Sequence, residues 1–342
     1  MKIRRHIDNY NFIADQETGM TFRWGKTFDD NPTFAPVPEL VDISISNHCS
    51  KGCGFCYRDS KPDNSFMSIN DYKYVLNSLK HPKYGNVFQV ALGGGEPLEH
   101  PDFLEIINLT KQFNIVPNFT TNGLLISDSL AKKIRGNIGA VAVSITNINN
   151  IADTNIKYLI DNNIRTNIHY VIDRENISQA ISILNGEFNS KLVGINAVVF
   201  LTFKPSGRGH NELTVKPGNQ LNKFVGLIDE HNCACSIGFD ACFVPLLMHY
   251  TKTQKDVIDF CEVGFFSVYV DENLNVSPCS FSNGKDTYNI RDYKFYDIWL
   301  NKFSVFRSRI NNLCNQICSG HGECKGRCQY YPEITICYKD EV

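Results

Sequence analysis

The sequence has no run of about 18 apolar residues, the length that predicts a membrane-spanning helix. Its N-terminal segment, MKIRRHID, lacks the apolar core of a secretion signal. Basic and acidic side chains are nearly balanced, 34 against 36, which excludes the charge pattern typical of nucleic-acid binding. No low-complexity segment is present. We therefore expect a cytoplasmic globular protein with no nucleic-acid or membrane partner.

Cysteine is absent between residues 57 and 232, although the 342-residue chain contains 13 cysteines. Three lie at 49–56, and the other ten lie in residues 233–342. A reducing cytosol does not favour structural disulfides, and an odd number of cysteines cannot pair completely. This uneven distribution predicts two separate metal-binding regions.

Strand-like and helix-like segments alternate from Val41 onward, which predicts a parallel sheet with crossover helices. Strands are expected at 41–46, 87–92, 115–119, 139–145, 166–172 and 192–203. Helices are expected near 68–80, 101–113, 127–135, 153–162, 176–186 and 218–231. Six such units fit the length better than a complete eight-unit barrel, which takes about 250 residues. The expected fold class is α/β, with a partial (β/α)6 barrel of the TIM type.

The chain divides by composition into three expected regions. Short strands at 12–15 and 20–24, joined through a Thr18-Gly19 turn, indicate an N-terminal hairpin. After Cys233 the sequence is rich in cysteine, glycine and short strands. The expected regions are an N-terminal extension at 1–40, a barrel at 41–232 and a cysteine-rich domain at 233–342.

Cys49, Cys53 and Cys56 follow the first barrel strand with the spacing C-x3-C-x2-C. Three thiolates on one tight loop can hold three corners of a 4Fe–4S cube and leave the fourth iron open for a ligand. A zinc knuckle is the alternative interpretation, in which His48 serves as the fourth ligand.

Further polar and glycine-rich motifs follow the next strands. Residues 93–96 read Gly-Gly-Gly-Glu, and residues 120–123 read Thr-Thr-Asn-Gly. Taken alone, the first motif is better explained by a glycine-rich turn before a helix, and the second could be an Asn-Gly turn. A strand histidine such as His169 is more often a core residue. Because carboxyl ends of parallel strands meet at one edge, we expect these motifs, Ser144 and His169 to lie near the three cysteines.

In combination, these motifs over roughly residues 40–205 resemble the radical S-adenosylmethionine (radical SAM) superfamily. The resemblance implies a 4Fe–4S cluster on the three cysteines and S-adenosylmethionine on the open iron. It implies that Gly94, Gly95 and Glu96 receive the methionyl ammonium of the cofactor. It also implies that Ser144 and His169 contact the ribose or carboxylate, and that the adenine lies by Phe55 and Tyr57. The implied cofactor-binding residues are Phe55, Tyr57, Gly94, Gly95, Glu96, Asn122, Ser144 and His169.

Seven C-terminal cysteines resemble the SPASM extension of these enzymes, which carries two auxiliary 4Fe–4S clusters. Cys261 and Cys279 bracket an expected hairpin with its turn at 271–275. Two details depart from the pattern: a C-x3-C pair begins the second block, and Leu274 replaces the hairpin glycine. The seven are Cys261, Cys279, Cys314, Cys318, Cys324, Cys328 and Cys337.

Two cubes need eight ligands, and our candidate for the eighth is Cys242, with Cys233 or Cys235 as substitutes. The resemblance implies a first auxiliary cluster on Cys242, Cys261, Cys279 and Cys328. It implies a second on Cys314, Cys318, Cys324 and Cys337. Spacing alone does not distinguish these sites from two zinc sites, so a non-catalytic zinc-stabilised interaction protein stays an alternative.

The resemblance implies reductive cleavage of S-adenosylmethionine to a 5′-deoxyadenosyl radical, which abstracts hydrogen from a substrate. We favour a ribosomally made peptide that is oxidised or cross-linked, with a small metabolite as the alternative. Expected partners are a reductant such as flavodoxin or ferredoxin and a separate leader-peptide-binding protein. The basic segment 204–210 contacts cofactor or an acidic peptide, or forms a solvated turn. No general acid or base can be assigned, and Thr146 replaces the aspartate of sulfatase-maturing relatives.

Overall fold

The computed structural model describes residues 2–254, 258–311, 324 and 326–337. Within them, a ten-stranded sheet has the strand order β10-β9-β8-β7-β6-β5-β4-β11-β12-β13, and a second sheet has the order β1-β2-β3. No helix among these residues is long and apolar enough to cross a membrane.

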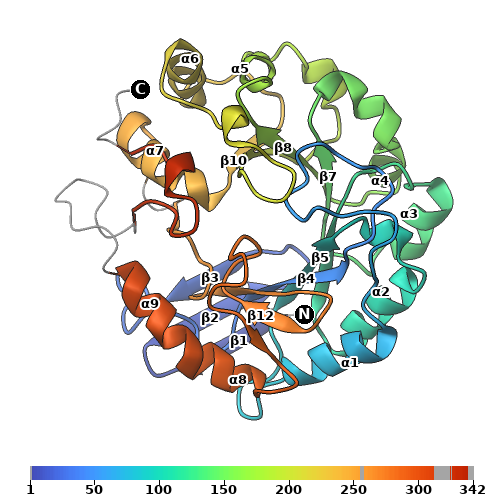
Figure 1. Ribbon diagram of the computed structural model, residues 1–342, viewed down its shortest axis with the longest axis vertical. Coiled ribbons are helices and arrows are strands. Elements are labelled where there is room, and N and C mark those ends of the chain that lie inside the picture. Colours follow the sequence, from blue (N-terminus) through green and yellow to red (C-terminus); the bar gives the residue numbers. More distant parts are fainter. Residues whose placement is uncertain (1, 255–257, 312–323, 325, 338–342) are drawn as a thin grey trace.

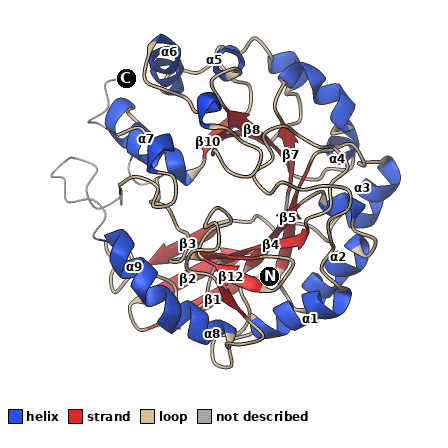
Figure 2. Cartoon of the chain, viewed as in Figure 1, coloured by secondary structure: helices blue, strands red, loops and turns tan. Residues whose placement is uncertain are grey.

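Seven consecutive strands of the large sheet are parallel and follow one another in chain order. Crossover helices cover the convex side of this sheet (Figures 1 and 2). The predicted partial barrel is confirmed, and β10 adds a parallel strand to the six expected. The strands are β4 (Leu40–Ser46), β5 (Gln89–Gly94), β6 (Val116–Thr121), β7 (Val141–Ile145), β8 (Thr166–Ile172), β9 (Ala197–Thr202) and β10 (Ser236–Phe239).

Amphipathic segments with local start signals form the crossover helices. The Ser127 hydroxyl, for example, accepts a hydrogen bond from the Leu130 amide (3.2 Å) and begins α3 at the expected place. The crossover helices are α1 (Ile69–Ser78), α2 (Phe103–Gln112), α3 (Asp128–Ile134), α4 (Lys157–Asp161), α5 (Ile177–Leu184) and α6 (Asn219–Ile228). Short 3-10 turns are η1 (Pro97–Glu99), η2 (Ile148–Thr154), η3 (Asn189–Lys191), η4 (Asn211–Leu213), η5 (Ala241–Phe243) and η8 (Pro332–Ile334).

The two faces of the parallel strands differ in polarity. On β8, Ile168 and Tyr170 are fully buried beneath the helices, whereas Asn167 and His169 point to the concave face and are partly exposed. Each buried large apolar side chain contributes about 1.5–3 kcal/mol. The helices are therefore held by apolar packing, and the concave face keeps polar groups available to a ligand.

The small sheet contains the predicted N-terminal hairpin. It comprises β2 (Tyr10–Asp15) and β3 (Thr21–Trp24), which pair antiparallel, and β1 (Lys2–Ile7), which the sequence did not predict. Gly19 has φ +73° in the β2–β3 turn, a conformation that glycine adopts without strain.

The C-terminal segment extends the barrel sheet at its opposite edge. The predicted hairpin is present as β11 (Ser267–Val270) and β12 (Asn275–Ser277), with β13 (Tyr288–Asn289) beyond. Strand β11 lies parallel to β4, and Leu274 in the turn has φ +67°, the left-handed conformation expected of a glycine. The remaining helices are α7 (Val244–Tyr250), α8 (Phe295–Asp297), the π-helical turn η7 (Ile298–Lys302) and α9 (Phe303–Asn311).

The proposed boundary between residues 232 and 233 stays a prediction. Strands on both sides of it, β9 and β10, pair within one sheet. Cys314 and Cys318 lie outside the described residues.

Candidate functional site

The three N-terminal cysteines lie on a loop, residues 47–57, at the carboxyl end of β4. This cysteine loop is held by the amide of Cys49, which donates to the Lys61 carbonyl (3.1 Å), and by that of Cys56, which donates to the Cys53 carbonyl (3.2 Å). Burial raises the pKa of the Cys49 and Cys53 thiols. Iron binding would therefore release protons from these thiols. In the part of the chain described, no three His, Cys, Asp or Glu side chains converge on a single-ion site.

The glycine strap, residues 93–96, fastens the cysteine loop to the end of β5. The Gly95 amide donates to the Ser46 carbonyl (2.6 Å), and the Glu96 amide donates to the His48 carbonyl (2.9 Å). A Cβ atom at Gly95 would lie 2.0 Å from the His48 oxygen, whereas one at Gly93 would meet nothing within 4 Å. The chain itself therefore makes the close approach at Gly95, and Gly93 faces open space.

Glu96 connects the loops that follow β5 and β6. Its buried carboxylate accepts hydrogen bonds from the Thr121 hydroxyl (2.6 Å), the Asn122 amide (2.7 Å) and the Leu98 amide (3.1 Å). Burial raises the pKa of Glu96, and these hydrogen bonds oppose the rise. The carboxylate positions Asn122, and its assignment to a methionyl ammonium stays a prediction.

His48 and Ser50 are fixed by a carboxylate that the sequence did not single out. Glu99 lies 3.1 Å from the His48 Nε2 atom and accepts a hydrogen bond from the Ser50 amide (3.1 Å). His48, the candidate fourth ligand of a zinc knuckle, thus points its Nε2 atom at Glu99.

Arg208, from the basic segment after β9, clamps the cysteine loop from the other side. Its Nε atom donates to the Cys53 carbonyl (2.8 Å), and its guanidinium pairs with Asp59 (2.8 Å). Its backbone amide donates to the Cys56 carbonyl (2.9 Å). The Arg208 hydrogen bond lowers the pKa of Asp59. Arg208 binds the loop itself, a role that sequence reasoning missed; Gly207 and Gly209 on either side of it were the available signal.

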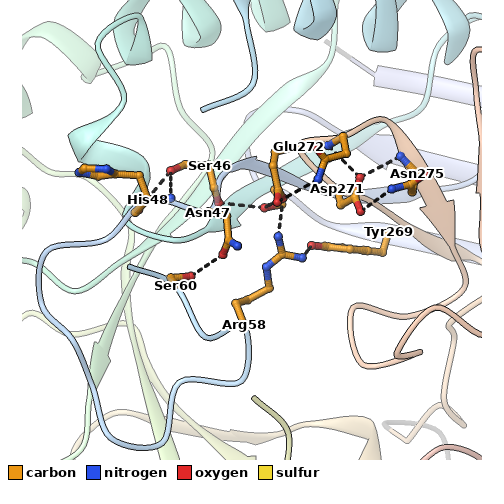
Figure 3. Close-up of polar contacts among 11 residues, drawn as sticks. Ser46, Asn47, His48, Arg58, Ser60, Tyr269, Asp271, Glu272 and Asn275 are labelled. Carbon is orange, nitrogen blue, oxygen red and sulfur yellow. Dashed lines mark hydrogen bonds and ion pairs between the residues drawn. The ribbon is translucent and has the colours of Figure 1, made fainter. Parts of the chain in front are cut away.

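Arg58 ties the cysteine loop to the C-terminal hairpin (Figure 3). Its guanidinium donates to the Tyr269 hydroxyl and pairs with the Glu272 carboxylate. The same carboxylate accepts a hydrogen bond from the Ser44 hydroxyl (3.1 Å) on β4. In the turn, Asp271 accepts from the Asn275 amide (2.8 Å). This network joins segments more than 200 residues apart and fixes the hairpin relative to the loop.

The concave face brings together two of the predicted cofactor-binding residues. Ser144 and His169 are register partners on β7 and β8. Burial lowers the pKa of His169 to about 4, so its imidazole is neutral at physiological pH. Asp42 on β4, which sequence reasoning missed, lies on the same face, and burial raises its pKa to about 6. The alternation Val41-Asp-Ile was the available signal, because it directs an acid away from the apolar side.

A contact between aromatic rings leads from the cysteine loop toward the C-terminal cysteines. The ring centroids of Tyr57 and Phe281 lie 4.6 Å apart, and the Phe281 amide nitrogen lies 3.5 Å from the Cys279 sulfur. Burial raises the pKa of Tyr57 to about 12, so the phenol stays protonated. Phe55 is half-buried on the same loop.

C-terminal cysteines line a cavity with about 670 Å³ of empty space, including the solvent at its opening. Burial raises the pKa of Cys261 to about 12 and that of Cys279 to about 11. A hydrogen bond from Cys242 lowers the pKa of Cys328. The buried Lys204 ammonium also faces this cysteine cavity and pairs with Asp240 at 2.9 Å. The cysteines that line the cavity are Cys242, Cys261, Cys279, Cys324 and Cys328.

This arrangement favours Cys242 over its two substitutes. Cys233 and Cys235 do not line the cavity, and their sulfur atoms lie 3.6 Å from each other. Cys324, expected in the second ligand set, borders the cavity beside the first set, and Cys337 does not line it.

The class of protein is defined by the domain that carries the first cysteine loop. Residues 43–202 match the sequence model of the radical SAM superfamily. The chain therefore contains a radical SAM domain over these residues. This domain implies S-adenosylmethionine and a 4Fe–4S cluster as cofactors.

The sequence relatives include proteins of two functional groups. A probable GTP 3′,8-cyclase of Saccharolobus solfataricus is 28% identical over 56% of this chain and 65% of its own length. The mycofactocin maturase MftC of Mycolicibacterium smegmatis is 24% identical over 51% of this chain and 50% of its own. The chain thus matches less than two thirds of each relative.

Solved structures share the fold over nearly the whole chain. Streptococcus suis SuiB bound to S-adenosylmethionine superposes with a TM-score of 0.71 at 14% identity, covering 100% of this chain and 99% of that one. The protein anSMEcpe with bound AdoMet gives a TM-score of 0.64 at 19% identity, covering 89% of each chain. At this identity the likeness shows the fold alone.

Proposed function

We propose that this protein is a radical SAM enzyme that oxidises or cross-links a peptide. Cys49, Cys53 and Cys56 would hold a 4Fe–4S cluster, which when bound would supply one-electron reduction of S-adenosylmethionine and thereby hydrogen abstraction from the substrate. The observation that carries the proposal is the cysteine loop, held at the carboxyl edge of the barrel by the glycine strap and Arg208.

The residues around the loop have distinct proposed roles. The open space at Gly93 and the backbone at Gly94 and Gly95 receive the methionyl end of the cofactor. Neutral His169 and Ser144 offer hydrogen bonds to ribose or carboxylate without adding charge. Phe55, Tyr57 and Asn122 border the adenine and are positioned by their loops.

We propose that the cysteine cavity holds an auxiliary 4Fe–4S cluster on Cys242, Cys261, Cys279 and Cys328. Four cysteines from separate segments facing one space suit a cubane site, which takes four thiolates. Lys204 supplies a positive charge beside Cys242 and Cys279, which stabilises their thiolates. The second proposed cluster, on Cys314, Cys318, Cys324 and Cys337, depends in part on residues outside the described ranges.

A peptide substrate is supported by one protein that shares the fold and by one sequence relative. SuiB has also been solved with its precursor peptide SuiA, in a structure that superposes with a TM-score of 0.68 over 90% of this chain. MftC is named a maturase. The similarity to GTP cyclases favours a small molecule as a second candidate, although it covers only 56% of the chain.

The test begins with anaerobic reconstitution of the protein. We expect about twelve irons per chain, because three cubes contain four irons each, and formation of 5′-deoxyadenosine with dithionite. Cys49→Ala should abolish the deoxyadenosine and retain about eight irons. Colourless protein that binds zinc would support the interaction-protein alternative instead.

Substrate class is tested by co-expression with short peptides encoded beside the gene. A mass loss in such a peptide, absent with Cys49→Ala, supports the peptide proposal. Turnover of GTP or another small metabolite, with no change in any peptide, would contradict it. The reductant, a flavodoxin or ferredoxin, and a separate leader-binding protein stay predictions.

A further inference from the structure

Cys233 and Cys235 are the two cysteines that the proposed clusters leave unused, and they lie at the opposite end of β10 from the cysteine cavity. They directly precede the strand at Ser236, whereas Cys242 follows its last residue, Phe239. Four strand residues span about 13 Å. The pair is therefore separate from the edge that carries the radical chemistry.

The backbone is folded so that the two sulfurs meet. The side chain of Asn189 accepts a hydrogen bond from the Ala234 amide (2.8 Å) and donates one to the Asn232 carbonyl (2.8 Å). This double contact holds the bend between the cysteines, whose sulfur atoms lie 3.6 Å apart. Both side chains are half-buried against the core.

The two thiols are chemically unequal. A hydrogen bond from Cys235 lowers the pKa of Cys233, and the same contact raises the pKa of Cys235. The thiolate is the reactive form of cysteine in disulfide exchange. Cys233 is thus suited to attack, with Cys235 within reach to resolve the product.

We propose that Cys233 and Cys235 form a redox-active vicinal dithiol that exchanges with low-molecular-weight disulfides. The Cys233 sulfur attacks one sulfur of the external disulfide, whose S–S bond breaks and releases one thiol. The Cys235 sulfur then attacks the mixed disulfide and releases the second thiol. The pair becomes a disulfide, and the external disulfide receives two electrons and two protons. This site is independent of the proposed function.

The test treats the reconstituted anaerobic holoenzyme with oxidised glutathione at neutral pH and maps the products by peptide mass spectrometry. We expect a Cys233–Cys235 disulfide that dithiothreitol reverses. Cys235→Ser should accumulate glutathione on Cys233, because no resolving thiol remains. Cys233→Ser should react with oxidised glutathione at least about tenfold more slowly than the wild type.

Each variant also reports its iron content and its deoxyadenosine yield. Both should equal those of the wild type, because neither cysteine borders the cavity. Equal reaction rates for the two single variants, or no glutathione on Cys233 in Cys235→Ser, would overturn the proposal. Loss of about four irons in either variant would instead assign that cysteine to a cluster and would also overturn it.

Discussion

Replacing Gly95 with alanine should displace the cysteine loop from the glycine strap. The new Cβ would lie 2.0 Å from the His48 carbonyl oxygen and 2.7 Å from its carbon. Non-bonded carbon and oxygen atoms normally lie about 3.3 Å or more apart, so the backbone segments at Gly95 and His48 must separate by about 1.3 Å. No side-chain rotation relieves the overlap, because both neighbouring atoms belong to the main chain.

The energetic cost follows from this geometry. Overpacking costs about 1–3 kcal/mol. Separation also weakens the hydrogen bonds from the Gly95 and Glu96 amides, worth about 0.5–1.5 kcal/mol each. We expect Gly95→Ala to lower the free energy of unfolding of the apoprotein by about 2–6 kcal/mol in urea. After reconstitution, the variant should also bind less iron at the first cluster.

Gly93→Ala is the matched control, because its Cβ would meet nothing within 4 Å. We expect it to keep the stability and iron content of the wild type. Its Cβ enters the space proposed for the cofactor, so S-adenosylmethionine affinity should fall. If Gly95→Ala matched Gly93→Ala in stability and iron, the argument that the strap positions the loop would be wrong.

Three further predictions concern Asp42, Leu274 and Lys204. Burial raises the pKa of Asp42 to about 6, so ionisation of Asp42 should cost the apoprotein stability as pH rises from about 4 to 6. Asp42→Asn should remove this contribution, while that of Glu39, whose pKa burial raises to about 7, remains. The variant should gain about 3 kcal/mol over the wild type at pH 8 by urea unfolding, and a difference between the two proteins that does not change with pH would refute this. Leu274→Gly relieves about 1 kcal/mol of left-handed backbone strain but loses about 2–5 kcal/mol of side-chain packing. It should therefore destabilise the protein in the same urea assay, and an increase in stability would contradict this balance. Lys204→Met should lower the reduction potential of the auxiliary cluster in an EPR-monitored redox titration, since it removes a cation beside Cys242. Lys204→Arg keeps the charge and should leave the potential unchanged. Equal shifts of the potential in the two variants would exclude a charge effect.

Local sequence signals predicted much of the barrel. Alternating and apolar runs located the strands, because a strand directs successive side chains to opposite faces. Ser127 marked the start of α3, since its hydroxyl satisfies a free amide there. The hairpin turn at 271–275 was predicted, and in the structure Asp271 and Asn275 complete it by hydrogen bonding although Leu274 takes the position of a glycine.

The contacts that complete the site escaped prediction because their partners are distant in sequence. Arg208 reaches Cys53 and Arg58 reaches Glu272 across 155 and 214 positions. No local pattern encodes such pairs, and both arginines could equally have been solvated. Glu99, which fixes His48, was likewise an ordinary acidic residue in a helical turn until the loops were placed together.

The sequence by itself determined the chemistry available: the spacing of Cys49, Cys53 and Cys56, the glycines that follow β5 and the order of strands and helices. These are local, since they depend on residue type and chain geometry over a few positions. Only the tertiary structure decided which cysteines share a cavity, that Glu96 and Arg208 bind the loops, and that the surroundings of Asp42 raise its pKa. Distance and burial decide these properties, and both arise only when separate segments pack.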